Sequence, residues 1–423
     1  MNREIRLITP EYIEDYLTIY LNAYPAYKNT GNEGRDKYRP RFLRSMAEDK
    51  NIHFYGLFED DRLIAQMKLI DFEMNAFGKM QKATGLMALG VHPMHKKKGA
   101  ARDMVKFFEK YTEESGAIVS MLLPFRMDFY RNMGYGYGSK MEEYVLPTVN
   151  LPVSSKELQS QIRFIGSDEK ETEMLLDCYS RFAASYHGMV QKFEDELRDY
   201  KNDSETKRVG YFEENKLMGY VTYDINCMSE TNYTLNQINV KELVYLNQNA
   251  LNALLGFLQK QSDLAESIII RTGEPDFHHI LPSAQNISGH YTDFGFLETN
   301  TAAIGTMYKI CNPEKFILAT DYRKFIPFDL KIKFVYDDRF EHTKKETGIE
   351  FTTEGTWKPA DVNSSFDVIA TCDLSVLSSL LMGSAEFSSC VRLGAIRLSD
   401  NSYTEILDLL FHVSQKPWTN TDY

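Results

Sequence analysis

The sequence predicts a mixed α/β protein made of two copies of one unit, followed by a third domain of the α+β type. The chain has 423 residues, more than a single hydrophobic core usually supports. A strand–turn–strand pattern at residues 54–66 returns at residues 209–220, and Gly210 follows Gly56 by 154 positions. Beyond about residue 300 the pattern changes to alternating apolar runs and short helical stretches.

The same offset predicts further elements of the two units. Applied to the apolar run at residues 87–91, it points to a second strand at residues 241–245, and a helical stretch follows each strand. Pro147 and Pro152 flank a short polar connection that ends the first unit. We therefore divide the chain into residues 1–150, 151–298 and 299–423. In the third part we expect strands at 330–336 and 366–371, helices at 374–382 and 404–414, and a tail at 415–423.

The composition excludes several classes of protein. Hydrophobic residues make up 43% of the chain, enough for packed cores and too many for a disordered protein. A net charge of −12 argues against a nucleic-acid surface, because a polyanion is bound by clustered Lys and Arg, and it suits a cationic partner. The five scattered cysteines predict free thiols in a reducing compartment. Without a signal peptide or a long apolar stretch, we expect a cytoplasmic protein that does not bind membranes.

An anion site is predicted where the strand ending at Val91 leads into the helix that starts near Ala100. The connection contains Pro93 and three lysines at positions 96–98, and it enters the helix through small residues. A helix N-terminus leaves backbone N–H groups unpaired, so that it favours a negatively charged ligand. Gly99 and Ala101 let a pyrophosphate approach the backbone closely.

This loop resembles that of the GNAT acetyltransferases, in which Gln/Arg-x-x-Gly-x-Gly/Ala follows a strand ending in Val-x-Pro. Lys96 takes the first position, where the family has Gln or Arg, and Gly99 and Ala101 take the others. The repeat offset maps positions 93, 96 and 99 onto residues without phosphate-binding features: Asn247, Ala250 and Ala253. We therefore interpret the second copy as a degenerate GNAT-like unit that binds no cofactor.

A general acid is expected at Tyr130, in a short helix after the next apolar strand and before a Gly-Tyr-Gly turn. In the GNAT proteins that this segment resembles, a tyrosine lies beside the cofactor sulfur. A phenol, with a reference pKa of about 10, suits the protonation of a leaving thiolate. The oxygen of the acetyl group also needs a donor, and we expect a backbone N–H from a splayed strand at Leu89, Gly90 and Val91.

Over its full length the chain resembles the Eis (enhanced intracellular survival) family of acetyltransferases. The resemblance rests on the His-Lys-Lys-Lys-Gly loop, the degenerate second unit, the third domain and the ending Lys-Pro-Trp-Thr-Asn-Thr-Asp-Tyr. It implies tandem GNAT folds followed by a sterol-carrier-protein-like domain, acetyl-CoA as co-substrate, and a homo-oligomer, often a hexamer. It also implies that the terminal carboxylate, here that of Tyr423, returns to the first domain as general base, with Tyr130 as general acid. The implied cofactor contacts are Leu89, Gly90, Val91, Lys97, Lys98, Gly99, Ala100, Ala101, Arg102, Phe125 and Arg126.

The acceptor is expected to be a primary amine of a cationic small molecule, aminoglycoside-like or polyamine, or a lysine side chain. No carboxylate lies between Asp15 and Glu33, where relatives carry an acidic substrate contact, so that Asp422 is the remaining candidate. An alternative from another class is a lipid or sterol carrier with the GNAT units as scaffold. We expect no metal, since His278 and His279 lack the spacing of a tetrahedral set.

Overall fold

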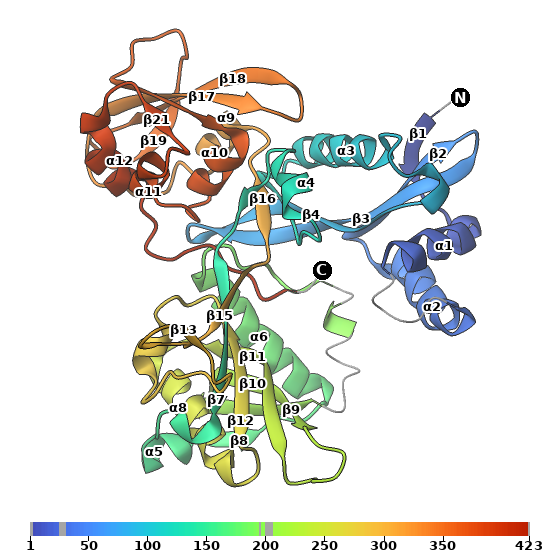
Figure 1. Ribbon diagram of the computed structural model, residues 1–423, viewed down its shortest axis with the longest axis vertical. Helices are drawn as coiled ribbons and strands as arrows, with labels where there is room; N and C mark the ends of the chain where they lie inside the picture. The colour runs from blue at the N-terminus through green and yellow to red at the C-terminus, as the bar shows by residue number, and fades with distance from the viewer. Residues whose placement is uncertain (1–2, 25–30, 194–195, 199–205, 422–423) are drawn as a thin grey trace.

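The computed structural model describes residues 3–24, 31–193, 196–198 and 206–421 of the chain. Two seven-stranded sheets, a five-stranded sheet and a two-stranded hairpin form its framework. Figure 1 shows the first seven-stranded sheet at the centre, the five-stranded sheet beside it and the second seven-stranded sheet below. The tandem α/β units and the different third part that the sequence predicts are therefore present.

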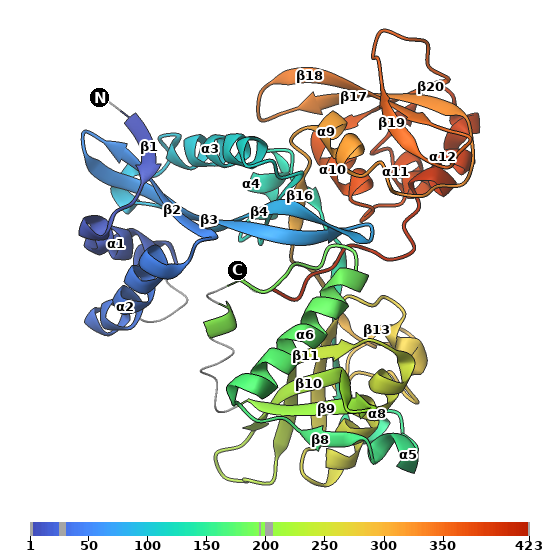
Figure 2. The same ribbon diagram turned by 180° about the vertical axis from the view of Figure 1, so that it is seen from behind.

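The first sheet has the order β1-β2-β3-β4-β5-β16-β6, and β4 and β5 are parallel neighbours. A parallel pair needs a crossover, which α3 (Ala100–Glu114) provides with a buried stripe at Met104, Phe108 and Thr112. Helices α1 (Ile13–Ala23) and α2 (Asn32–Glu48) cover the opposite face (Figures 1 and 2). The strands are β1 (Arg3–Leu7), β2 (Ile52–Glu59), β3 (Arg62–Ala76), β4 (Lys79–Val91), β5 (Val119–Leu122), β6 (Gly136–Tyr137) and β16 (Met307–Lys309).

The second sheet repeats this plan in the order β15-β7-β12-β11-β10-β9-β8. Its strands β11 and β12 are parallel, and α8 (Gln248–Gln259) connects them. Both units turn between their second and third strands through two consecutive residues of positive φ, at positions 60–61 and 214–215. This turn matches the twist of a hairpin. The strands are β7 (Lys140–Pro147), β8 (Ile162–Phe164), β9 (Lys207–Glu213), β10 (Lys216–Cys227), β11 (Asn236–Tyr245), β12 (Ser267–Thr272) and β15 (Thr301–Ile304).

The repeat offset holds as far as the end of β11 and then breaks. Residues 92–99 separate β4 from α3, whereas residues 246–247 alone separate β11 from α8. The positions mapped from the sequence, Ala250 and Ala253, therefore lie inside α8 and are buried in the core of the second unit. The second unit has thus lost the loop itself, rather than keeping the loop with other side chains.

The two sheets exchange strands, which the division at residues 150 and 298 does not anticipate. β7 leaves the first sheet directly after β6 and pairs with β12 and β15 in the second. In the first sheet, β16 pairs with both β5 and β6. Residues 140–147 and 301–304 therefore belong to the second sheet, and residues 307–309 to the first. Polar connections in a sequence mark the ends of elements, not the sheet that each strand joins.

The third part is a five-stranded sheet in the order β19-β18-β17-β20-β21 with helices on it. Strands and helices occur where alternating runs and apolar stretches predicted them, within a few residues. Every residue of α10 is buried, and α10 packs on β6 so closely that a Cβ at Gly136 would lie 2.2 Å from the carbonyl oxygen of Ser375. The elements are α9 (Pro313–Ala319), β17 (Leu330–Asp338), β18 (Thr343–Phe351), β19 (Trp357–Ala360), β20 (Val368–Asp373), α10 (Leu374–Leu381), α11 (Phe387–Arg392), β21 (Arg397–Leu398) and α12 (Thr404–Phe411).

After α12 the tail runs from the third part into the space between the first sheet and the second unit (Figures 1 and 2). The Trp418 N–H donates to the carbonyl oxygen of His187 at 3.0 Å, and its indole packs near Phe182 in α6 (Glu169–Ser185). A Cβ at Gly273 would lie 2.2 Å from that indole, so a glycine there makes room for the tail. Thr421 is buried, and the two residues after it lie outside the described part of the chain.

His187 joins three parts of the molecule. Its Nε2 lies 2.9 Å from the carbonyl oxygen of Met382 in the third part, and its ring stacks on Phe77 at the β3–β4 turn, with centroids 4.1 Å apart. The Phe77 N–H donates to Nδ1 at 3.2 Å. Burial is the main reason that the pKa of His187 falls to about 4.

Acidification is expected to destabilise the fold through His187. The neutral imidazole is kept in the folded chain, while the unfolded chain gains a proton below a pKa of about 6.5. Stability is therefore fully present above pH 6.5 and declines as the pH falls toward 4. Thermal unfolding at pH 7 and 4.5 checks this. His187→Gln should have a lower unfolding temperature than the unaltered protein at pH 7, but its unfolding temperature should fall less between pH 7 and 4.5. An identical pH dependence in both proteins would show that His187 is not the group responsible.

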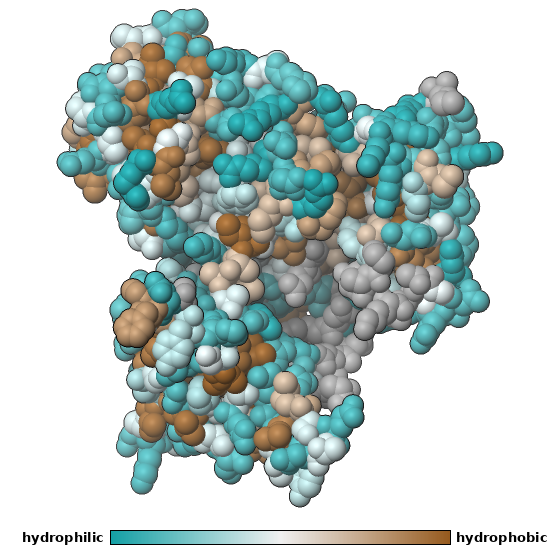
Figure 3. All heavy atoms as spheres, in the orientation of Figure 1, coloured by the Kyte–Doolittle hydropathy of each residue, from teal (hydrophilic) through white to brown (hydrophobic). Residues whose placement is uncertain are grey.

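Among the described residues, none of the helices has the length and apolar character needed to cross a membrane. On the face shown in Figure 3, hydrophobic side chains form separate patches among hydrophilic ones.

Candidate functional site

The first sheet splays open where β4 and β5 separate. Their parallel pairing covers residues 83–86 of β4, while β4 continues beside β3 as far as Val91. A bulge sets two residues of β4, Ala88 and Leu89, opposite one residue of β3, and Ala88 has a φ of 55°. The splayed strand was expected at residues 89–91, and the residue with the positive φ is the one just before them, Ala88.

Gly90 instead has a steric role. A Cβ there would lie 3.0 Å from the side chain of Ile19 and 3.2 Å from that of Ala23, both in α1. The missing side chain lets α1 pack against the splayed end of β4. This brings the end of α1 to the opening in the sheet.

The loop before α3 forms a backbone cradle. Lys97 has a φ of 61° and Gly99 a φ of 86°, so the backbone turns sharply just before the helix. Gly99 is the N-cap of α3 and no side chain caps this end of the helix. A Cβ built at Gly99 would have nothing within 4 Å, so that the space beside it is open. These are the properties of an anion site at a helix N-terminus.

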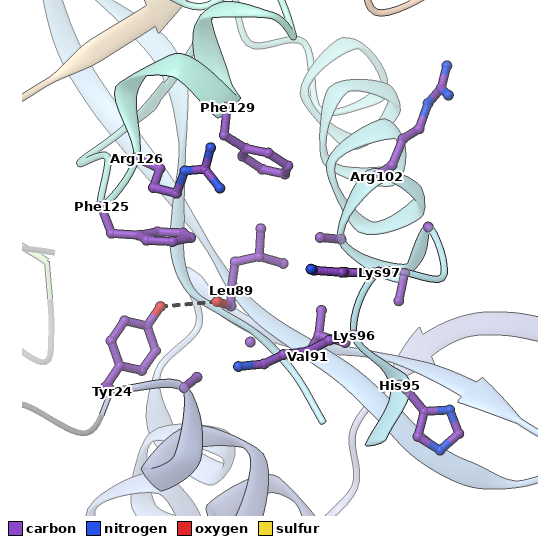
Figure 4. Close-up of a pocket in the computed structure, with 15 residues that line it drawn as sticks. Tyr24, Leu89, Val91, His95, Lys96, Lys97, Arg102, Phe125, Arg126 and Phe129 are labelled. Carbon is purple, nitrogen blue, oxygen red and sulfur yellow. Dashed lines mark hydrogen bonds between the residues drawn. The ribbon is translucent and has the colours of Figure 1, made fainter. Parts of the chain in front are cut away.

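A cavity of about 520 Å³ joins this cradle to the splayed strands (Figure 4). It brings together most of the residues that the sequence nominates as cofactor contacts. They are Leu89, Gly90, Val91, Lys97, Gly99, Ala100, Ala101, Arg102, Phe125 and Arg126.

Lys98 does not line the cavity. Two of the basic side chains that do line it, Arg102 and Arg126, already bind other groups of the protein. The Lys98 carbonyl oxygen accepts a hydrogen bond from Arg3 at 3.3 Å. The guanidinium of Arg102 donates to the carbonyl oxygen of Phe340 at 2.9 Å and points away from the cavity in Figure 4. Arg126 forms an ion pair with the carboxylate two positions along the chain, Asp128. Lys97 is therefore the nominated lysine that lines the cavity.

Other lining residues come from places that the sequence analysis did not nominate. The Tyr24 hydroxyl, just beyond α1, donates to the Leu89 carbonyl oxygen at 3.2 Å, the bond dashed in Figure 4. His95, Lys96 and Phe129 also line the cavity. The sequence analysis placed Lys96 in the loop motif without nominating it as a cofactor contact. Tyr24 could not have been nominated, since nothing in the local sequence shows that α1 ends at this cavity.

Tyr130 lies in a second, adjoining cavity of about 240 Å³, which shares Tyr24, Leu89 and Phe125 with the first. It is the fourth residue of α4 (Met127–Arg131) and is 3% exposed. Its ring packs edge-on against Phe125, with centroids 6.2 Å apart. Burial raises the pKa of Tyr130 well above its usual value, so the phenol stays protonated at neutral pH.

Two further segments with suitable residue types lie apart from this constellation, and two of the sequence candidates lie outside the described residues. The His92 ring accepts a hydrogen bond from the Met94 N–H and caps the turn that follows β4. Residues 291–296, which echo the Tyr130 segment in sequence, form the hairpin of β13 (Tyr291–Asp293) and β14 (Phe296–Leu297) instead of a helix. Asp422 and Tyr423, the nominated substrate contact and base, lie beyond the described residues.

Reversing the charge of the cradle is expected to weaken acetyl-CoA binding by well over tenfold. Lys97→Glu with Gly99→Asp puts two negative charges at an anion-binding helix N-terminus and a side chain where phosphate must approach the backbone. Calorimetric titration measures the loss. Lys98→Glu, which makes the same Lys-to-Glu change at a neighbouring position outside the cavity lining, is the control and should retain most of the affinity. Equal losses in both proteins would show a diffuse charge effect instead of a cradle.

Comparisons with known proteins agree with this geometry. A family model described as acetyltransferase (GNAT) domain matches residues 4–138, which hold the cradle and both cavities. A second acetyltransferase (GNAT) domain model matches residues 180–295. A search among curated protein sequences gave no match.

Solved structures with the same fold span the whole chain. A probable N-acyltransferase from Enterococcus faecalis V583 superposes with a TM-score of 0.78 at 18% identity, and Eis1 from Mycobacterium abscessus with 0.76 at 18%. A GCN5-related N-acetyltransferase from Anabaena variabilis gives 0.78 at 13%. Each alignment covers 100% of both chains.

The two GNAT matches and the site define the class of this protein: it is an acyl-CoA-dependent N-acetyltransferase with two GNAT domains in tandem. Over its whole length the chain shares its fold with Eis1 from Mycobacterium abscessus and with the probable N-acyltransferase from Enterococcus faecalis.

Proposed function

We propose that the first GNAT domain transfers the acetyl group of acetyl-CoA to a primary amine. The acceptor is an aminoglycoside-like or polyamine small molecule, or a lysine side chain. The observation that carries the proposal is a pair of cavities that share Tyr24, Leu89 and Phe125, one reaching the cradle at Lys97 and Gly99 and the other lined by Tyr130. The two cavities together accommodate a long ligand whose charged end lies at a helix N-terminus and whose reactive end lies between two strands.

The proposed reaction is direct attack of the amine on the thioester. The nitrogen bonds to the acetyl carbon, and a backbone N–H at residues 89–91 stabilises the charge that develops on the carbonyl oxygen. The carbon–sulfur bond then breaks, and Tyr130 protonates the departing thiolate. The amine loses its proton to the α-carboxylate of Tyr423, directly or through a water, and Asp422 contacts the acceptor.

The docked tail supports this role for the chain end. Asn420 accepts a hydrogen bond from the Tyr179 hydroxyl at 3.0 Å and donates to Glu242 at 3.2 Å. Glu242 is itself held by Lys192, at 2.9 Å. A tail fixed by polar contacts as far as Thr421 has little freedom left, in contrast to most chain ends, which are frayed.

The identity of the third domain, the location of the protein and its oligomeric state are part of the same proposal. We assign residues 299–423 to a sterol-carrier-protein-like domain, apart from the strands that join the GNAT sheets. We further propose a cytoplasmic homo-oligomer, a hexamer by resemblance to the family, that acts without a metal ion. A lipid carrier with the GNAT units as scaffold is the less favoured function, because both family matches are to acetyltransferase domains.

An acceptor screen tests the proposal. Acetyl-CoA is incubated with the protein and a panel of primary amines, and thiol release is measured. We expect release that depends on the amine, and a rise in the unfolding temperature with acetyl-CoA but not with fatty acids or sterols. Stabilisation by a lipid alone, without thiol release, would favour the carrier.

A further inference from the structure

The strands of the second unit part in the same way as those of the first. The parallel pairing of β11 with β12 covers residues 237–239, while β11 continues beside β10 as far as Tyr245. The repeat offset of 154 maps these paired residues onto residues 83–85, where β4 pairs with β5. The ladder of β10 and β11 also shifts its register just beyond, between Val240 and Glu242. The second unit therefore keeps the splay although it has lost the loop.

The chain's own tail contacts both of the strands that part. From β11, the Oε1 of Glu242 accepts a hydrogen bond from the Nδ2 of Asn420 at 3.2 Å. Directly after β12, Gly273 lies so close to the indole of Trp418 that a Cβ there would be 2.2 Å away. These two tail residues are two positions apart, so the tail lies across the separated ends of β11 and β12.

Both contact residues correspond to residues at the site of the first unit. Glu242 follows Ala88, the residue of positive φ in the β4 bulge, by the repeat offset of 154 positions. Gly273 comes six positions after the first β12 residue that pairs with β11, and Phe125 comes six positions after the first β5 residue that pairs with β4. Phe125 lines both cavities of the first unit. In the second unit the tail thus takes the place that corresponds to those cavities.

The residues that hold Asn420 form a buried polar network. The Tyr220 hydroxyl donates to the Oε2 of Glu242 at 2.6 Å, and Lys192 lies 2.9 Å from Oε1. The side chains of Lys192 and Glu242 are 6% and 9% exposed. The buried hydroxyl of Tyr179 lies 3.0 Å from the Oδ1 of Asn420. A buried ion pair adds little net stability compared with apolar residues of the same size, but each of its polar groups must keep a partner. Such a network favours one position of the Asn420 side chain.

We infer that the splay of the second GNAT unit is a docking site for the chain's own tail, with Glu242 and Tyr179 as positioning residues for the terminal carboxylate. The inference rests on the proposed function, in which that carboxylate takes the proton of the amine. Three residues follow Asn420 in the sequence, so that the carboxylate can lie at most about 10 Å from the anchored residue. The degenerate unit then contributes to catalysis by holding the proposed base, in the place where the first unit holds its cofactor.

A charge swap between Asn420 and Glu242 tests the positioning role. Lys192 carries one positive charge, and its partners Glu196 and Glu242 carry two negative ones. Asn420→Asp places a third carboxylate at hydrogen-bond distance from Glu242, so the tail should be repelled. We expect kcat to fall at least tenfold, as for a displaced general base, with acetyl-CoA affinity unchanged. Adding Glu242→Gln removes the extra charge and supplies an amide that donates to the new carboxylate. In this double variant kcat should return to that of Glu242→Gln alone.

Carboxypeptidase A, which removes aromatic C-terminal residues, reports on the tail without any acetyl transfer. Release of Tyr423 from Asn420→Asp should be at least tenfold faster than from the unaltered protein, because an anchored chain end cannot enter the protease. Adding Glu242→Gln should slow the release again. Ser414→Asp, which adds the same charge at an exposed position of the tail, is the control and should change neither the release nor kcat.

Tyr179→Phe provides a second variant should Asn420→Asp not fold. It removes the hydroxyl beside Asn420 and should raise the release of Tyr423 and lower kcat severalfold. Tyr211→Phe, which removes a hydroxyl that donates to Glu213 in the same unit, is its control and should do neither.

The outcomes separate this inference from the proposed function. Full kcat in Asn420→Asp, while removal of the last two residues abolishes transfer, would overturn the inference and leave the proposed function standing. A loss of kcat that Glu242→Gln does not reverse would overturn the role of Glu242. Thiol release with no amine from the unaltered protein would refute the proposed function, and the inference with it.

Discussion

Displacing the terminal carboxylate is expected to abolish acetyl transfer while acetyl-CoA still binds. Removal of Asp422 and Tyr423, or addition of a C-terminal His tag, should lower kcat by on the order of 10²–10⁴-fold, the range for loss of a general base. An amine is mostly protonated at neutral pH, so attack on the thioester requires a proton acceptor nearby. Removing two residues withdraws the carboxylate by up to about 7 Å, beyond hydrogen-bond reach.

Two further variants distinguish the contribution of the carboxylate to kcat from that of the rest of the tail. Tyr423→Phe keeps the α-carboxylate and should remain active. Gly273→Ala places a Cβ against the indole of Trp418, so that the tail must shift although its sequence is intact, and kcat should fall as in the truncated protein. Acetyl-CoA affinity, measured by calorimetry, should be unchanged in all of them. A tagged protein as active as the untagged one across the pH range would refute the role of the chain end.

Tyr130→Phe should lower kcat by on the order of 10²-fold, with little change in acetyl-CoA affinity. In the proposed reaction the hydroxyl protonates the leaving thiolate and contributes little to ground-state binding, whereas in the variant the ring keeps its contacts with Phe125 and Phe129. Because burial raises the pKa of this phenol, the phenol stays protonated over this range, and the substitution should lower kcat by the same factor at mildly alkaline pH as at neutral pH. Initial rates at saturating substrates from pH 7 to 9 measure the effect.

Tyr135→Phe is the matched control for this experiment. Tyr135 is also fully buried, its ring lies 5.9 Å from that of Tyr130, and its hydroxyl is within hydrogen-bond reach of Ser120, away from the lining of both cavities. It should keep a kcat near that of the unaltered protein. If Tyr130→Phe is as active as this control, Tyr130 is a packing residue and another group protonates the thiolate.

Much of the site could be predicted from the sequence because its chemistry lies in short segments. The cradle depends on residues 96–101, where a glycine, small side chains and the start of a helix follow one another, and such local order determines backbone conformation. Tyr130 was likewise found from its place after an apolar strand. Lys98, by contrast, lies outside the cavity lining, and no pattern of residue types shows which lysine of the loop faces the cavity.

The smaller cavity was hidden from sequence analysis for a different reason. Tyr20 lies on α1 and Tyr24 just beyond it, and both appear as ordinary aromatic residues in the sequence. The hydrogen bond of Tyr24 to β4, and the cavity that both residues line, depend on how α1 packs on the sheet. Gly90 looked like the source of an irregular backbone, yet it serves close packing against Ile19 and Ala23, and the bulge falls on Ala88.

By itself, therefore, the sequence determined the two-copy α/β plan, the hairpins and helices, the anion cradle and the tyrosine beside it, because each depends on periodicity or on a few consecutive residues. Only the tertiary structure decided that β7 and β16 exchange sheets, that the second unit lacks the loop, and that the tail docks on α6 with Gly273 making room for Trp418. These features join residues that lie far apart along the chain. The free energy that stabilises these contacts comes from the complementary shapes and hydrogen bonds of surfaces that exist once the chain has folded. No local sequence pattern encodes which of these surfaces will meet.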